Sequence, residues 1–491
     1  MKKVISILIL FPVFCFGQWN QVGNAINGQA SGDGGGWSTA MSADGTIVAM
    51  GSIFNDNGGG SAGQVRVFRL SNGVWTQIGN DINGETGGDQ TGQSVSLSAD
   101  GNIVAIGEPF NNDLGFTSGQ VRVFRNINDT WTQVGQELYG QNAVASAGTT
   151  VDLSADGTTV AFGAPNTIVN PFPSFTGNVE VYQLQGNSWV QKGGDIEGDG
   201  SIIKFGQSVS LSDDGNIVAI GQTGDPSNIN VPQLGRVKVY QFVNNQWTQI
   251  GNTILGQVDR DEFGFRVSLS ASGNILAIST NASNVVVVYQ LNGVVWNQMG
   301  DAMFGENPGD GFGSSISLSN DGSRVAIGAK RYTSGSSIGR AYVFENQDGN
   351  WTPFENPIVG VSIDGQFGFS IAISQDGSRV AVGGINIIDA GSNNGQVRVF
   401  EFENTPLSAV DFNSSNQIEV FPNPTNSYVQ IKNSATIDSY ALFSIEGKKV
   451  KSESFSNLNE LTIDMSGLSA GVYLLKINAN GHIKNNKIIK Q

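Results

Sequence analysis

The chain has 491 residues and a formal net charge of −16, because 42 acidic residues outnumber 26 basic ones. So acidic a protein repels polyanions, which argues against binding to nucleic acid or to an anionic membrane through overall charge. The acidic surface is compatible with binding of cations and of neutral partners, such as glycans or protein surfaces. The single cysteine, Cys15, and the single histidine, His482, lie near opposite ends of the chain. The residues between them include no cysteine or histidine, so they can form no disulfide, no Ser-His-Asp triad and no histidine-ligated metal site.

Residues 1–17 contain two lysines and then a hydrophobic run that ends in a small residue, Gly17. This pattern predicts a secretory signal peptide cleaved before Gln18, which would remove Cys15. The run is too short to span a membrane, and no other apolar run is long enough. We expect an exported protein without a transmembrane segment.

A unit of four alternating segments recurs seven times in residues 18–403. In the clearest copy, residues 93–98, 102–107, 120–124 and 131–135 alternate apolar and polar positions between turn residues, which predicts antiparallel strands a, b, c and d. Four-stranded units at this period predict a seven-bladed β-propeller, an all-β fold. Strand b ends on Ala-x-Gly in six units and on Ala277-Ile278-Ser279 in the fifth. The glycines of the a–b turns lie 49 to 58 residues apart and are Gly45, Gly101, Gly157, Gly215, Gly273, Gly322 and Gly377.

The outer strands predict how the ring closes. A tryptophan begins strand d after each of the first six units, whereas the seventh unit ends with its strand c. The missing strand is predicted at residues 19–23, so that the amino terminus completes the last blade and removes an open sheet edge. We interpret the tryptophans as packing between blades. The b–c and d–a connections are the longer ones and share one face, where we expect recognition.

The openings of several strands a resemble a known repeat. Phe205-Gly206, Phe263-Gly264, Phe312-Gly313 and Phe367-Gly368 open strand a, and Gly163-Ala164-Pro165 follows strand b. These residues resemble the FG-GAP repeat of integrin α-type propellers, over about residues 18–403. The resemblance implies a seven-bladed fold. The calcium loops of that family, with a D-x-D-x-D-G pattern, are not matched.

The carboxyl-terminal segment changes in composition after a polar linker at residues 404–416. Alternating runs at 428–431, 441–445, 461–463 and 472–477 predict a small Ig-like β-sandwich over residues 417–491. Residues 420–424, 447–450, 464–473 and 484–490 also resemble the type A C-terminal sorting domain of the type IX secretion system. That resemblance implies transfer across the outer membrane of a Gram-negative bacterium by the type IX machinery, followed by release or attachment to the surface.

Five aspartates form an acidic pattern before the strands a. They lie three or four residues before the opening glycine and are Asp33, Asp89, Asp261, Asp310 and Asp364. Carboxylates converging near the propeller axis would suit Ca²⁺. The alternative is that each aspartate only caps its own turn through a local hydrogen bond.

Two functions follow as hypotheses. The first is a monomeric, non-enzymatic binding or adhesion module, exported and directed at a glycan or protein. The second is a carboxylate-dependent enzyme that degrades extracellular polysaccharide, which would need two acids close together in one cleft.

Overall fold

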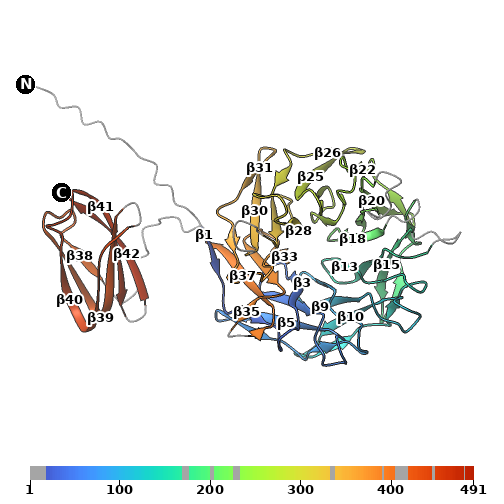
Figure 1. Cartoon of the computed structure of the whole chain (residues 1–491), viewed down its shortest axis with the longest axis horizontal. Helices are drawn as coiled ribbons and strands as arrows, with labels where there is room; N and C mark the ends of the chain where they lie inside the picture. Colours follow the sequence, from blue (N-terminus) through green and yellow to red (C-terminus); the bar gives the residue numbers. More distant parts are fainter. Residues whose placement is uncertain are drawn as a thin grey trace, which may run out of the picture. The chain divides into compact units, whose positions relative to one another are not determined.

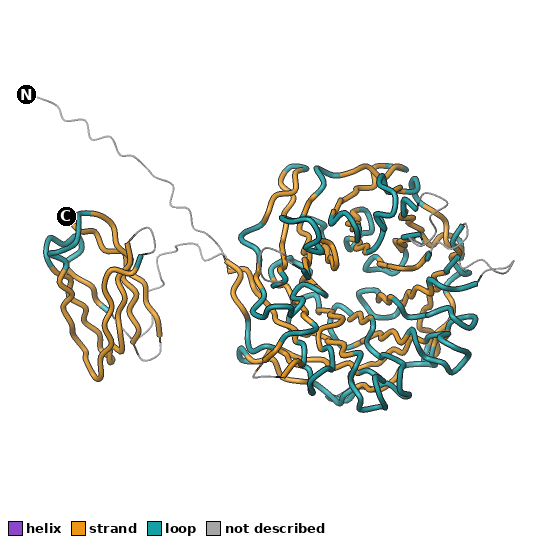
Figure 2. Tube along the Cα trace, viewed as in Figure 1, coloured by secondary structure: helices purple, strands orange, loops and turns teal. Residues whose placement is uncertain are grey.

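The structure is a computed structural model, and it describes residues 18–168, 176–199, 204–224, 233–331, 338–389, 392–403, 418–444, 448–479 and 482–491. The expected signal peptide and linker therefore lie outside the described residues. The chain divides into two compact units between residues 404 and 405. Strands and loops make up the described part of both units (Figure 2). No helix in the described residues is long and apolar enough to cross a membrane.

The first unit is a seven-bladed β-propeller, as predicted, with the first strand of each blade nearest the centre (Figure 1). Blade 1 comprises β3 (Gly35–Met41), β4 (Ile47–Ser52), β5 (Gln64–Ser71), β6 (Val74–Gln77) and β7 (Ile82–Asn83). Blade 2 comprises β8 (Ser94–Leu97), β9 (Ile103–Glu108), β10 (Gln120–Asn126), β11 (Trp131–Gln133) and β12 (Leu138–Tyr139). Blade 3 comprises β13 (Thr150–Leu153), β14 (Thr159–Ala164), β15 (Asn178–Gln185), β16 (Ser188–Gln191) and β17 (Ile196–Glu197).

The remaining blades repeat this order of strands. Blade 4 comprises β18 (Phe205–Leu211), β19 (Ile217–Gln222), β20 (Arg236–Val243), β21 (Gln246–Gln249) and β22 (Ile254–Leu255). Blade 5 comprises β23 (Arg266–Leu269), β24 (Ile275–Ser279), β25 (Val285–Asn292), β26 (Val295–Gln298) and β27 (Met303–Phe304). Blade 6 comprises β28 (Phe312–Leu318), β29 (Arg324–Ala329), β30 (Arg340–Gln347), β31 (Asn350–Pro353) and β32 (Ile358–Val359). Blade 7 comprises β33 (Ser370–Ile373), β34 (Arg379–Gly384), β37 (Gln396–Glu403), β1 (Gln18–Gln21) and β2 (Ile26–Asn27). A small hairpin, β35 (Ile388–Asp389) and β36 (Ser392–Asn393), lies in its b–c connection.

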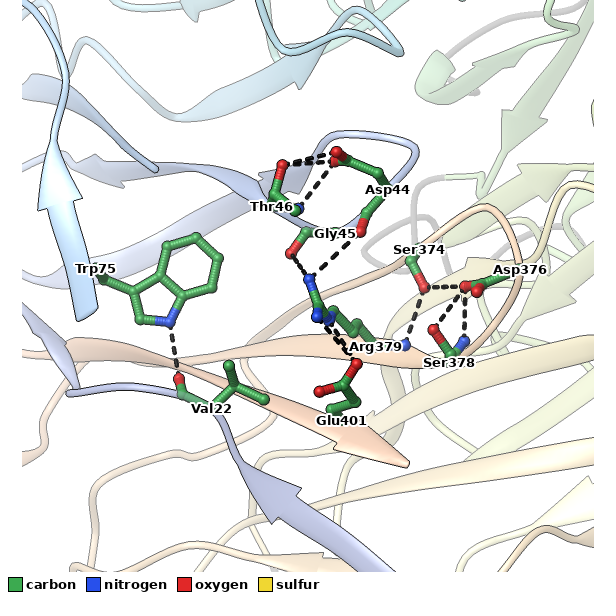
Figure 3. A network of polar contacts seen from close by, with 10 residues as sticks. All are labelled: Val22, Asp44, Gly45, Thr46, Trp75, Ser374, Asp376, Ser378, Arg379 and Glu401. Atoms are coloured by element: carbon green, nitrogen blue, oxygen red, sulfur yellow. Dashed lines mark hydrogen bonds and ion pairs between the residues drawn. The ribbon is translucent and has the colours of Figure 1, made fainter. Parts of the chain in front are cut away.

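The amino terminus closes the ring, as predicted. β1 pairs antiparallel with β37, from Gln18 opposite Glu403 to Gln21 opposite Phe400. The indole N–H of Trp75 in blade 1 donates to the carbonyl of Val22, at 2.8 Å (Figure 3). The closing segment is thus bonded to both blades at the junction.

A second closure lies on the face of the short a–b turns. The backbone N–H of each turn donates to a carbonyl of the next blade, at 2.8 to 3.0 Å, and the last bond runs from Gln375 to Ala43. Arg379 reinforces this junction, because its guanidinium donates to the carbonyl of Gly45 and pairs with Glu401 at 2.9 Å (Figure 3). The ring through the turns consists of Ala43, Ala99, Ala155, Asp213, Ala271, Asn320 and Gln375.

The propeller core is divided among the junctions between blades. Within the described residues, each of the seven junctions has its own cluster of buried apolar side chains. The tryptophans of strand d act as predicted, since each indole N–H from Trp75 to Trp351 donates to a backbone carbonyl of the preceding blade. At each of the six junctions a glycine of the preceding blade lies so close that a Cβ would come within 2.5 to 3.1 Å of the indole Cδ1, which explains Gly23, Gly79, Gly135, Gly193, Gly251 and Gly300.

The second unit is a small β domain with its own core. Its sheet has the order β38 (Glu419–Phe421), β39 (Tyr428–Ser444), β41 (Gly471–Ala479) and β42 (His482–Lys490), and β40 (Lys449–Asp464) also pairs with β39. The strands predicted at 428–431 and 441–445 are one strand, β39. Shifts of register after Lys432 and Ile437 let its two halves pair with different neighbours. The core of this unit includes the fully buried side chains of Val429, Leu442 and Leu475.

Candidate functional site

The central cavity of the propeller is formed by the first strands of all seven blades. Its volume is about 270 Å³, and it opens toward the face of the long b–c and d–a connections at the start of these strands. The lining is mostly hydroxyl, amide and aliphatic, and its one charged residue is Arg266 of β23. The described lining includes no aspartate or glutamate. A neutral polar cavity with one cation is an unexpected centre for so acidic a chain.

A repeated hydroxyl position explains how the blades meet around this cavity. The residue two places after the opening glycine is serine or threonine in six blades, and the serine hydroxyls donate to the carbonyl of the next blade's opening glycine at 2.6 to 2.9 Å. These residues are Ser38, Ser94, Thr150, Ser208, Ser315 and Ser370. The contact needs a glycine in the paired strand, because a Cβ at Gly51 would lie 2.3 Å from the Ser38 oxygen.

Blade 5 departs from this pattern at both positions. Arg266 replaces the hydroxyl residue, and its partner across the sheet is Ser279 where the other blades have glycine. The two departures belong together, since removing the small hydroxyl side chain makes room for a Cβ opposite it. Blade 5 therefore lacks the hydrogen bond from this position to the next blade, and in its place it has an arginine that lines the cavity.

The Arg266 guanidinium lies against an aromatic ring. It stacks on Phe265, with 4.3 Å from its central carbon to the ring centroid, and Nη1 donates to the Phe265 carbonyl at 3.3 Å. No carboxylate of the described residues pairs with it, and burial alone shifts its pKa. Burial without an anionic neighbour lowers the pKa of Arg266 to about 10, so the group is charged at neutral pH and has no counterion among the residues that the structure describes.

A second cation and two aromatic rings continue the mouth of the cavity. Lys330, just after β29, lies over the ring of Phe369 with 5.0 Å from Nζ to the centroid. Phe369 contacts Trp37 of blade 1, with their ring centroids 4.8 Å apart. The pKa of Lys330 is lowered to about 8, first by burial and then by the charges of Arg266 and Arg331. Blades 5, 6, 7 and 1 thus supply cations and aromatic faces to one side of the mouth.

The five aspartates of the calcium prediction lie in the d–a connections, and four of them accept local or nearby backbone hydrogen bonds. Asp33 accepts from the N–H of Ala30 at 2.8 Å and Asp89 from that of Thr86 at 3.0 Å. Asp310 accepts at 2.9 Å from the N–H of Phe312.

Asp261 joins two connections, because its Oδ1 accepts from the N–H of Ser283 at 2.7 Å. Asp364 is exposed, with φ +59°. Nowhere in the described part of the chain do three or more Asp, Glu, His or Cys side chains converge as a metal site would require. Asp33, Asp89 and Asp310 make the local hydrogen bonds that the turn-capping alternative expects, and the calcium site stays a prediction.

Buried acids elsewhere in the propeller have protein partners. Glu108 is fully buried and pairs with Arg122, with 2.5 Å between Nη2 and Oε1. Burial raises the pKa of Asp152 to about 6, although Ser96 and the N–H of Leu211 donate to its carboxylate at 2.8 Å. These acids connect strands and blades, and neither lines the central cavity.

Arg266 was not among the site residues predicted from the sequence, and neither were Lys330 and Trp37. Aligning the seven units on their opening glycines would have identified Arg266, as the one residue of its column that is neither serine nor threonine. Lys330 and Trp37 have no such signal, because their columns vary from blade to blade.

A comparison with known protein families defines the class of the second unit. The family model of the secretion system C-terminal sorting domain matches residues 419–491. The protein is therefore a seven-bladed β-propeller that carries a type IX sorting domain, and it is secreted or attached to the cell surface. No curated protein matches the chain by sequence.

Solved structures share the propeller fold. Raptor from Chaetomium thermophilum is 12% identical with a TM-score of 0.50, over 79% of this chain and 29% of that one. The β-propeller domain of Cps50 (Swd1) from Myceliophteria thermophila is 11% identical with a TM-score of 0.49, over 78% and 99%. A putative 6-phosphogluconolactonase from Bacteroides uniformis is 13% identical with a TM-score of 0.48, over 71% and 94%. At these identities the likeness extends to the fold alone.

Proposed function

We propose that the protein is an exported binding module that recognises a glycan or protein outside the cell with the face of its long connections. The sorting domain supports export, through contact with the type IX secretion machinery. The observation that carries the proposal is a concentration of exposed apolar side chains on this face. Phe110, Leu114 and Phe116, all in the b–c connection of blade 2, are 39%, 62% and 74% exposed.

Neighbouring connections extend this apolar surface. Phe54 of blade 1 is 40% exposed and contacts Trp37 at the cavity mouth, with 5.7 Å between ring centroids. Ile363 before blade 7 is 60% exposed. On the opposite face the c–d turns expose aliphatic side chains such as Val74, Ile127 and Val294 at the rim, and the a–b turns around the axis contribute no exposed large apolar side chain among the described residues. Grouped apolar side chains on the surface of a soluble protein mark interaction sites.

The carboxylate-dependent enzyme is supported by no specific feature of this face. Glycoside cleavage needs two carboxyl groups facing one cleft. The aspartates of the d–a connections accept hydrogen bonds from backbone N–H groups, and the described lining of the central cavity has no acid.

The test is a glycan and protein binding array probed with the exported protein. We expect binding that Phe110→Ser/Phe116→Ser weakens at least tenfold, because apolar anchors contribute most of the affinity of such surfaces. The matched control is Val74→Ser/Val294→Ser, which changes two exposed apolar side chains in c–d turns on the opposite face. An array without a ligand, or equal loss in both variants, would overturn the proposal.

A further inference from the structure

We propose that the mouth of the central cavity binds a uronic acid unit of a glycan, with Arg266 holding its carboxylate. The inference rests on the proposed binding function and names the class of ligand that the same face would take. It is argued from the cations at the mouth, from the aromatic faces beside them, and from the departure of blade 5 from the repeat.

The cations define the anionic part of the ligand. Arg266 lines the cavity without a carboxylate partner among the described residues, and the ring of Phe369 lines the same cavity. Lys330 lies over that ring, so both cations belong to one mouth, and the charge of Arg266 accordingly lowers the pKa of Lys330. Like charges gathered in a partly buried site repel each other, and a bound anion relieves that repulsion. A carboxylate suits the planar guanidinium because it accepts two parallel hydrogen bonds from it. The net charge of −16 makes such a local cationic site specific rather than part of a general affinity for anions.

The aromatic and hydroxyl groups define the rest of the ligand. Trp37 and Phe369 present ring surfaces at the mouth, and the C–H face of a sugar ring packs on such surfaces. Serine, threonine and glutamine side chains line the space beyond them and suit a polyhydroxylated ligand. The cavity of about 270 Å³ is slightly smaller than ligand pockets, which typically hold roughly 300–1,000 Å³, so it suits a ligand of one ring rather than a longer chain. One sugar ring with a carboxylate fits this combination better than an inorganic anion, which would use the cations alone.

The other six blades have serine or threonine at the position of Arg266, which argues that the arginine does not serve stability. Six blades keep a hydroxyl residue at this position, and in five of them the hydroxyl bonds to the next blade. Arg266 gives up that bond and leaves a partly buried charge without an acidic partner among the described residues, which costs stability. The hydroxyl of its partner Ser279 is fully buried and also lacks a hydrogen-bond partner. A ligand that pairs with the guanidinium accounts for Arg266, and Ser279 then follows because no hydroxyl side chain lies opposite it to exclude a Cβ.

The experiment is isothermal titration calorimetry of the full exported protein with glucuronate and galacturonate. Glucose, the methyl ester of glucuronate and inorganic phosphate are the comparison probes. We expect at least one uronate to bind, and glucose and the ester to bind at least tenfold more weakly because they lack the charge-assisted hydrogen bonds. Phosphate binding as tightly as either uronate would overturn the assignment to a sugar, and equal binding of glucose would overturn the role of the carboxylate.

The decisive variant is Arg266→Ser/Ser279→Gly, which restores the pattern of the other blades and should therefore fold at least as well. It is expected to weaken uronate binding at least tenfold, and Arg266→Lys by less. Arg69→Ser is the matched control, since it removes an equal charge from an exposed site on the opposite face. Unchanged uronate binding in the double variant would overturn the inference. An array ligand bound equally by the double variant and lost in Phe110→Ser/Phe116→Ser would overturn it too, while the proposed function would stand.

Discussion

Closure of the ring by the amino terminus can be tested with the variant Trp19→Ala/Ile26→Ala. Trp19 packs on Phe354 and Phe402 at the junction of blades 6 and 7. Ile26 is 2% exposed and belongs to the cluster between blades 7 and 1. Because the two side chains lie in different clusters, their effects should add.

The magnitude follows from burial. Truncating a buried isoleucine to alanine costs about 2–5 kcal/mol, and truncating a half-buried tryptophan costs about 2 kcal/mol, below the range for full burial. The sum is about 5 kcal/mol. An unfolding entropy of about 2.1 cal/mol/K per residue gives the propeller about 0.8 kcal/mol/K, so the unfolding midpoint should fall by about 6 °C. The hydrogen-bonded ring through the a–b turns remains, so the variant should still fold.

Differential scanning calorimetry measures the midpoint, with Gln18→Ala/Gln21→Ala as the control. That control changes exposed side chains of the same strand, and substitutions of this kind usually change stability by about 0.5 kcal/mol or less. A midpoint of the double variant within about 1 °C of the unmodified protein would refute the closure by packing described here.

Three other predictions concern export, calcium and pH. Removing residues 417–491 should leave a folded propeller in the periplasm, because the two units have separate cores; normal levels of the truncated protein in the medium, measured by immunoblot, would contradict the sorting role. If the aspartates bind calcium, a hundredfold excess of calcium over Kd should add about 2.7 kcal/mol to the free energy of unfolding. The variant Asp89→Asn/Asp261→Asn/Asp310→Asn should abolish this gain. A calorimetric midpoint of the unmodified protein that calcium does not change would leave the aspartates as turn caps. The raised pKa of Asp152, about 6 against an ordinary 3.8, means that the folded state binds its proton more tightly, so its contribution to stability is present below about pH 4 and is lost as the pH rises to about 6. Asp152→Asn should remove that part of the pH dependence in denaturant unfolding, and identical slopes in both proteins would refute it.

Much of the fold could be predicted because it depends on local pattern repeated many times. The a–b turns with their glycines, the alternating strands and the tryptophans of strand d each recur often enough to be recognised. Two-residue strands such as β7 and β12 could not be predicted, because so short a segment has no hydrophobic period of its own. They pair with strand c only because strand c extends beyond the end of strand d. In the sorting domain, β39 was predicted as two strands because its register shifts interrupt the alternation.

The candidate site shows where the sequence by itself stops. The sequence determined that there are seven blades, that the first strand closes the last one, and that the aspartates precede the strands a. Only the tertiary structure decided what these residues face. Backbone N–H groups donate hydrogen bonds to four of the five aspartate carboxylates. The Arg266 side chain, in contrast, lines the cavity. The physical reason is that turn geometry is fixed by neighbours in the chain, while the cavity exists only when seven blades, far apart in sequence, bring their first strands around one axis.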